Sequence, residues 1–126
     1  MSTLNVANIS DGADSIPTGY VVNGSAKAWV EWDGTGIIYL RDSMNVSSVT
    51  DNGVGQFTAN FTNNMDTASY SFSLSCKRAV TSNESVFINV DNNPTASTFN
   101  LIISRAAATN AADSQYVSAT FHGDLA

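Results

Sequence analysis

The chain has 126 residues, of which 43% are hydrophobic and only 13% are charged. This length fits one domain with a core of its own and excludes two. The net charge is −6 and only five residues are basic. The sequence therefore lacks the basic patch that nucleic acids and anionic membranes attract, and we expect neither as a partner.

Polar but uncharged side chains replace the missing charges, since serine, threonine and asparagine make up about a third of the chain. Such a surface is common on extracellular and virion proteins. The single cysteine, Cys76, excludes an intrachain disulfide, and we expect it to be a small core residue. Residues 1–20 lack the basic and apolar regions of a signal peptide, and no apolar run approaches the roughly 20 residues of a membrane span.

Residues 1–24 differ from the rest of the chain and predict an N-terminal arm. Leu4, Val6 and Ile9 indicate a short strand near the N-terminus, and the turn-rich segment 10–15 follows it. The arm is too short to fold alone. We therefore expect it to lie on a partner subunit or another docking surface.

From residue 25 onward, apolar residues alternate with polar ones, which predicts strands. An Asn52-Gly53 pair adds a strong hairpin signal, because it accepts the positive φ angles of a tight turn. Residues 105–112 are rich in alanine but lack an apolar stripe, so we expect a loop there. The expected strands include residues 28–32, 46–49, 57–61, 70–76, 86–90, 99–103 and 117–121, together with 37–40, which is apolar on both faces and suggests a central or interface strand. The prediction is an all-β domain over 25–126, an antiparallel, jelly-roll-like β-sandwich of about eight strands.

The two tryptophans lie three residues apart, so on a strand they face opposite ways. We expect Trp32 in the core and Trp29 at a subunit interface, where an aromatic ring contributes a large contact area. A sugar-stacking role for Trp29 is the alternative. Tyr39, in the strand that is apolar on both faces, is a further candidate interface residue.

Candidate catalytic and metal-binding residues are few. His122 is the only histidine, and no nucleophile elbow accompanies it. Glu31 and Glu84 are the only glutamates, and most aspartates occur in turns, where Asp bonds its own backbone. No cysteine–histidine cluster is present, and the oxygen-rich turns 63–66 and 91–93 do not follow the twelve-residue calcium loop. We therefore expect no enzyme activity, no cofactor and no metal site, although bound calcium at these turns stays open.

Three stretches resemble a module that recurs in the genomes of tailed phages of marine and freshwater bacteria. They are Met1–Val6 with Ile9, Asp11 and Gly12; Gly24–Val30 with Asp33–Gly36; and Arg41–Ser43, Asn45–Gly55, Phe57 and Asn60–Thr62. The resemblance covers about the first half of the chain. The module usually reads Asn-Phe-Asn where this chain has Glu31-Trp32-Asp33.

The resemblance implies a virion structural protein, and we expect a non-enzymatic tail-fibre component that forms the knob or tip and attaches to the host. A homotrimer is expected, with the arm docked on another fibre or baseplate protein and the loops against a host-surface glycan or protein. The alternatives are a capsid decoration protein and, from another class, a carbohydrate-active enzyme. The expected interface residues are Leu4, Val6, Ile9, Trp29 and Tyr39, and the expected receptor-contact residues are Asn63, Asn64, Asp66, Asn92, Asn93, Thr95, Asn110 and Asp113.

Overall fold

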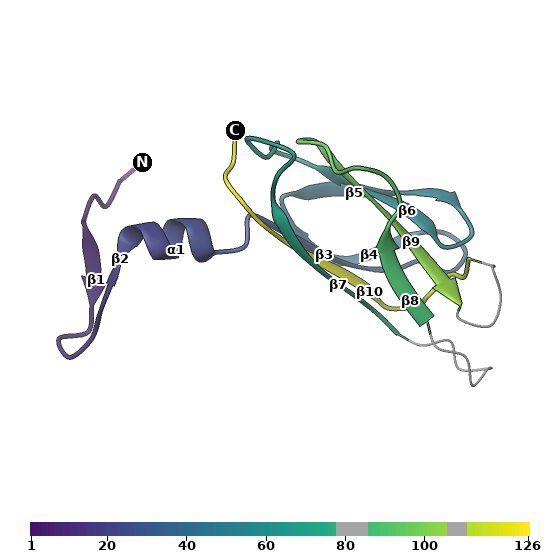
Figure 1. Cartoon of the computed structure of the whole chain (residues 1–126), viewed down its shortest axis with the longest axis horizontal. Coiled ribbons are helices and arrows are strands. Elements are labelled where there is room, and N and C mark those ends of the chain that lie inside the picture. Colours follow the sequence, from purple (N-terminus) through teal and green to yellow (C-terminus); the bar gives the residue numbers. More distant parts are fainter. Residues whose placement is uncertain (78–85, 106–110) are drawn as a thin grey trace.

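The computed structural model describes residues 1–77, 86–105 and 111–126 and consists of an N-terminal arm and a β-sandwich (Figure 1). The arm contains β1 (Asn8–Ser10), β2 (Ser15–Pro17) and α1 (Thr18–Gly24). The sandwich contains β3 (Ala28–Asp33), β4 (Tyr39–Met44), β5 (Val46–Gly53), β6 (Gln56–Phe61), β7 (Ser71–Cys76), β8 (Val86–Val90), β9 (Thr98–Arg105) and β10 (Val117–His122). The predicted all-β sandwich is confirmed.

Two antiparallel four-stranded sheets form the sandwich, one in the order β4-β3-β10-β7 and the other in the order β5-β6-β9-β8. The first and last strands of the domain are therefore neighbours, and Ala119 lies opposite Val30 in their register. A hairpin joins β5 to β6 in the second sheet, as predicted, but its turn is Val54-Gly55. The expected turn at Asn52-Gly53 is wrong, because both residues still belong to β5 and Asn52 does not adopt a positive φ. Strand order brings the edge strands β7 and β8 side by side along one side of the sandwich.

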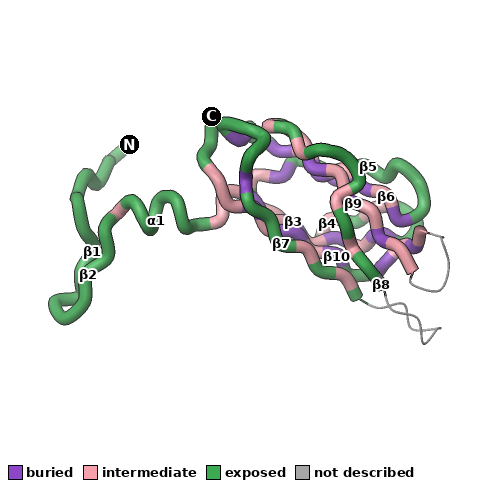
Figure 2. Tube along the Cα trace, viewed as in Figure 1, coloured by how far each residue is buried: buried purple, intermediate pink, exposed green. Residues whose placement is uncertain are grey.

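The core between the sheets is built by the period-two alternation of the strands. In β3, Ala28, Val30 and Trp32 are buried while the residues between them are half-buried on the outer face. The same alternation runs through β6, β9 and β10. Figure 2 shows the buried positions following these central strands. The prediction that Trp32 enters the core is therefore confirmed.

A single residue, Asn45, separates β4 from β5 and carries the chain from one sheet to the other. Its φ is +56°, a left-handed conformation that asparagine tolerates better than most residues. The Asn45 side chain fixes this corner, since its Oδ1 accepts a bond from the backbone N–H of Asn63 at 2.7 Å and its Nδ2 donates to the Asn63 carbonyl at 3.0 Å. The chain therefore passes from β4 in one sheet to β5 in the other without a loop.

Two local expectations are wrong. The segment 37–40 does not form a central strand, because β4 begins only at Tyr39 and lies at a sheet edge, and Ile37 is 94% exposed. The alternative, an interface strand, stays a prediction. The arm does not form a strand through Leu4 and Val6, because the hydrogen-bonded strand is β1 at Asn8–Ser10. In both places, tertiary pairing decides the position of the strand, and the local run of apolar residues does not. The expected loop at 105–112 falls mostly on residues outside those described.

Candidate functional site

The arm presents apolar side chains that its own sandwich does not cover. Every residue from 1 to 25 is exposed except the half-buried Thr18 (Figure 2). Three of the expected interface residues lie here, with Leu4 81% exposed, Val6 38% and Ile9 46%. A hairpin of two three-residue strands and a seven-residue helix are too small to be stable in water by themselves. Contact of the arm with another surface stays a prediction.

The other two expected interface residues lie on the outer face of the β4-β3-β10-β7 sheet. Trp29 is half-buried and pairs across the strands with Met44 and Thr120. Tyr39 is 64% exposed and lies opposite Asp33, near the other end of the same sheet. Both side chains are accessible on one face but are separated along it, and their contact with another subunit stays a prediction.

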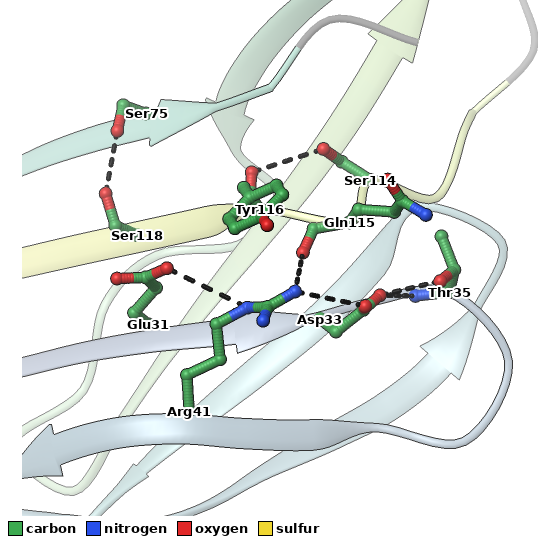
Figure 3. A network of polar contacts seen from close by, with 9 residues as sticks. All are labelled: Glu31, Asp33, Thr35, Arg41, Ser75, Ser114, Gln115, Tyr116 and Ser118. Carbon is green, nitrogen blue, oxygen red and sulfur yellow. Dashed lines mark hydrogen bonds and ion pairs between the residues drawn. The ribbon is translucent and has the colours of Figure 1, made fainter. Parts of the chain in front are cut away.

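A polar network surrounds Arg41 on this outer face, which we call the Arg41 cluster: Glu31, Asp33, Thr35, Arg41, Gln115 and Tyr116 (Figure 3). A β-bulge between Glu31 and Trp32 shifts the register of β3 and β4 beside Arg41. The Arg41 guanidinium donates to Asp33 at 3.2 Å and to the Gln115 carbonyl at 3.0 Å, and its Nε lies 3.8 Å from Glu31. The guanidinium therefore joins β3, β4 and the segment that leads into β10.

Asp33 is held in its ionised form by its neighbours. Its Oδ1 accepts bonds from the Thr35 hydroxyl at 2.6 Å and the Thr35 backbone N–H at 2.9 Å. These two bonds, followed by the charge of Arg41, lower the pKa of Asp33. The carboxylate is a stable acceptor, and this environment does not suit a proton donor at neutral pH.

Tyr116 is the aromatic member of the Arg41 cluster and is 45% exposed. The Arg41 guanidinium carbon is 4.2 Å from the centroid of its ring, and the Lys77 ammonium is 5.2 Å away. Contacts of this kind between a cation and an aromatic face are attractive. The ring is thus positioned by two basic side chains while nearly half of the residue stays open to a ligand.

Beside Tyr116 lies a shallow pocket of about 340 Å³, which we call the Tyr116 pocket. Its volume is at the lower end of the range for small-ligand pockets, roughly 300–1,000 Å³. The hydroxyls of two lining residues, Ser75 and Ser118, lie 2.7 Å apart, and Figure 3 shows them on neighbouring strands. The lining residues are Glu31, Ser75, Cys76, Lys77, Tyr116, Val117 and Ser118. Carboxylate, hydroxyl and ammonium groups around an aromatic ring suit a ligand rich in hydroxyl groups.

The expected receptor-contact loops are divided between the two ends of the sandwich. Residues 63–66 and 92–95 lie at the end from which the arm projects, where Asp66 bonds to Asp124 and Met65 to Ala96 through the backbone. Asp113 lies at the opposite end, where its carboxylate accepts the Gly55 N–H at 2.7 Å. Asn110 lies outside the described residues. The structure therefore does not bring these residues into one contact surface.

Several of these loop residues stabilise the fold itself. Asn63 locks the Asn45 corner, and the Asn64 carbonyl accepts a bond from Ala126. The Thr95 hydroxyl accepts the backbone N–H of Thr98 at 2.9 Å and closes a turn. Asp66, Asn92 and Asn93 are exposed. The polar composition of these loops thus reflects turn chemistry in part, which is why composition by itself did not separate contact residues from structural ones.

The Arg41 cluster and the Tyr116 pocket were not predicted from the sequence. Tyr116 precedes β10, and Arg41 follows an apolar run in β4, so no local motif joins them. The only available signal is the presence of Glu31 and Asp33 two residues apart in an alternating strand, which places two carboxylates on one face. Finding the arginine between them requires the register of β4.

Cys76 packs against the core, as expected of a small core residue, but it is only half-buried. It points to the inner side of β7, but β7 is an edge strand and only part of the thiol is covered. This partial burial raises the pKa of the Cys76 thiol. At neutral pH the residue is mainly a thiol, which is less reactive than a thiolate.

Among the described residues, no group of three or more histidine, cysteine, aspartate or glutamate side chains is close enough to hold a metal ion. His122 lies opposite Ser71 at the arm end of its sheet. Within the same described segments, no helix is long and apolar enough to cross a membrane. Comparisons with protein-family models, with curated proteins and with solved structures find no match to this chain.

Proposed function

We propose that this protein is a non-enzymatic structural component of a phage virion, a tail-fibre knob or tip that attaches to the host surface. The observation that carries the proposal is its construction in two parts. An arm whose apolar side chains are exposed projects from a folded sandwich (Figure 1). The exposed apolar side chains of the arm would bind another virion protein, and the sandwich would project away from that contact.

If the arm docks, the far end of the sandwich faces outward. The Tyr116 pocket lies toward this end, because Val117 begins β10 there while His122 ends the strand near the arm. We propose the pocket, with its hydroxyl, carboxylate and ammonium groups, as the receptor site, and a host-surface glycan as its ligand. Loops 63–66 and 92–95 lie at the end near the arm. In this orientation they would contact neighbouring virion proteins and would not face the host.

The first experiment places the protein on the particle. Immunogold labelling of intact virions is expected to put gold at the tail end. Gold distributed over the head would reject the fibre role and favour a decoration protein, for which the same arm would clamp a neighbouring head subunit. A chain lacking residues 1–24 is expected to keep its β-sheet circular dichroism and to be lost from particles. Normal incorporation of this folded variant would contradict a docking role for the arm.

The second experiment tests the pocket with purified glycans from the host surface. Tyr116→Leu is expected to weaken binding at least about tenfold, or roughly 1.4 kcal/mol, because the aromatic surface of the pocket is lost. Tyr39→Leu is the matched control, since Tyr39 is exposed on the same sheet and does not line the pocket. Because Tyr39 is also an expected interface residue, both variants are compared at a mass confirmed by light scattering. Equal binding by both variants would reject the pocket. Release of new reducing ends from the glycan would favour the enzyme alternative.

A further inference from the structure

Within the described residues, one side of the sandwich ends in two edge strands that lack the usual protection. Natural edge strands are usually protected from pairing with other chains by charged residues, proline or bulges. β7 reads Ser-Phe-Ser-Leu-Ser-Cys and β8 reads Val-Phe-Ile-Asn-Val, with neither a charge nor a proline. The two strands lie side by side, so both unguarded edges are on the same side.

The apolar side chains along this side are only partly covered. Leu74 and Cys76 of β7, and Ile88 and Val90 of β8, pack against the core but are half-buried. Phe72, at the start of β7, is 37% exposed although its ring lies 4.7 Å from that of Phe99. We call this strip, formed by β7 and β8, the open edge. A layer of apolar atoms laid over it would complete the core.

The arm carries the complementary surface. Ile9 and Ile16 lie directly opposite each other in the β1–β2 hairpin and are 46% and 43% exposed. The helix adds Tyr20 and Val22, which are 72% and 58% exposed. None of these side chains packs on the sandwich of the same chain, from which the arm points away (Figure 1). The same chain thus has an uncovered apolar arm and an uncovered apolar edge.

The charges at the two surfaces are also complementary. The arm contains no lysine or arginine up to residue 26, and its turn carries Asp11 and Asp14. Among the described residues, Lys77 follows β7 at the open edge, and the half-buried Arg105 ends the neighbouring strand β9 beside the start of β8, so both lie at the end far from the arm. Asp91 follows β8 at the opposite end. The acidic hairpin turn is attracted to Lys77 and Arg105 and repelled by Asp91, so these charges favour an orientation in which the turn lies near the two basic residues.

We propose that the arm of one copy lies along the open edge of a second copy. Ile9 and Ile16 then cover Leu74 and Cys76, and Asp14 approaches Lys77. Exchange between two copies closes a twofold dimer, and exchange around a ring closes a trimer. This inference goes beyond the proposed function, and it can be tested separately because an exchange between copies would occur in the purified protein. It competes with part of that function, since an exchanged arm is not free to dock on another virion protein and lies beside Cys76 and Lys77 of the Tyr116 pocket.

The rate at which the native Cys76 reacts with a maleimide measures whether the arm covers the open edge. In the full-length protein we expect a dimer or trimer by light scattering, with Cys76 labelled by a maleimide at least about tenfold more slowly than in the double variant Ile9→Ser/Ile16→Ser. The double variant keeps the whole sandwich sequence, is expected to be a monomer, and is checked by circular dichroism. A monomeric full-length chain, or equal labelling of Cys76 in both proteins, would overturn the exchange.

Cross-linking tests the contact directly. Ile16→Cys is expected to form a disulfide between chains with Cys76 under mild oxidation, and adding Cys76→Ser should abolish it. Thr35→Cys is the control for random collisions, since Thr35 is exposed on a loop after β3, away from the open edge. Cross-linking at equal rates from both positions would also overturn the exchange. A monomer that still enters virions would overturn the exchange alone and leave the proposed function standing.

Discussion

Gly55 is the position where one added methyl group should be most damaging, and Gly36 is its natural control. Both glycines have a φ of +68°, which L-residues adopt only at a cost of about 1–2 kcal/mol. At Gly36, an added Cβ would meet nothing within 4 Å. At Gly55, it would lie 2.6 Å from the Ile103 carbonyl oxygen and 2.7 Å from the Ala112 nitrogen. These are backbone atoms, so the surrounding chain has to move.

The expected losses of folding free energy therefore differ. Gly36→Ala should cost about 1–2 kcal/mol through backbone strain alone. Gly55→Ala adds an overpacking cost of about 1–3 kcal/mol, for a total of about 2–5 kcal/mol. The shift of Ala112 should also disturb Tyr116, because residues 112–116 form one short segment that leads into the Tyr116 pocket.

Urea unfolding followed by tryptophan fluorescence measures both variants. The buried Trp32 lies edge-on to Phe57, two residues beyond Gly55, so its emission reports on this region. Equal losses for Gly36→Ala and Gly55→Ala would refute the packing argument. A soluble Gly55→Ala protein with weaker glycan binding would further support the link between this turn and the Tyr116 pocket.

Three further perturbations have defined outcomes. Burial raises the pKa of Tyr70 to about 12 from 10.0. Between about pH 10 and pH 12 only the unfolded state loses this proton, so the free energy of unfolding should fall as pH rises through that range. Tyr70→Phe should remove this fall in a series of urea denaturations across the same pH range. Asn45→Ala should lower the folding stability by about 2 kcal/mol, because it keeps the left-handed strain and loses the bonds to Asn63. Asn45→Gly relieves the strain and should lower it by only about 1 kcal/mol. Equal urea midpoints for the two variants would contradict this. Trp29→Ala should lower the mass measured by light scattering if Trp29 lies at a subunit contact, and an unchanged mass would reject that contact.

The sequence by itself determined which side chains enter the core. Successive side chains of a strand point to opposite faces, so alternation identifies the buried set before any pairing is known. The expected inward residues of β3, β6, β9 and β10 are buried, from Ala28 at the start of β3 to Phe121 near the end of β10. The sequence also indicated a hairpin in this region, but it placed the turn two residues too early, since the turn is Val54-Gly55 and Gly55 has the positive φ.

The arm was predictable in outline only. Its lack of a core and its turn-rich middle are visible in the sequence, but the helix α1 is not. The segment Thr18–Gly24 contains two glycines and two valines, which are poor helix formers, and no side chain caps its N-terminus. Sequence propensity therefore offered no sign of this helix.

Only the tertiary structure decided which strands are central and which are edges. That order depends on pairings between distant residues, such as β3 with β10, which no local window contains. Cys76 is half-buried and Ile37 exposed for this reason, although both occur in apolar patterns. The Tyr116 pocket arises in the same way, because Glu31, Lys77 and Tyr116 meet through the neighbouring strands β3, β10 and β7. Local alternation sets the face of each side chain, and long-range pairing sets its neighbours, on which both candidate binding surfaces depend.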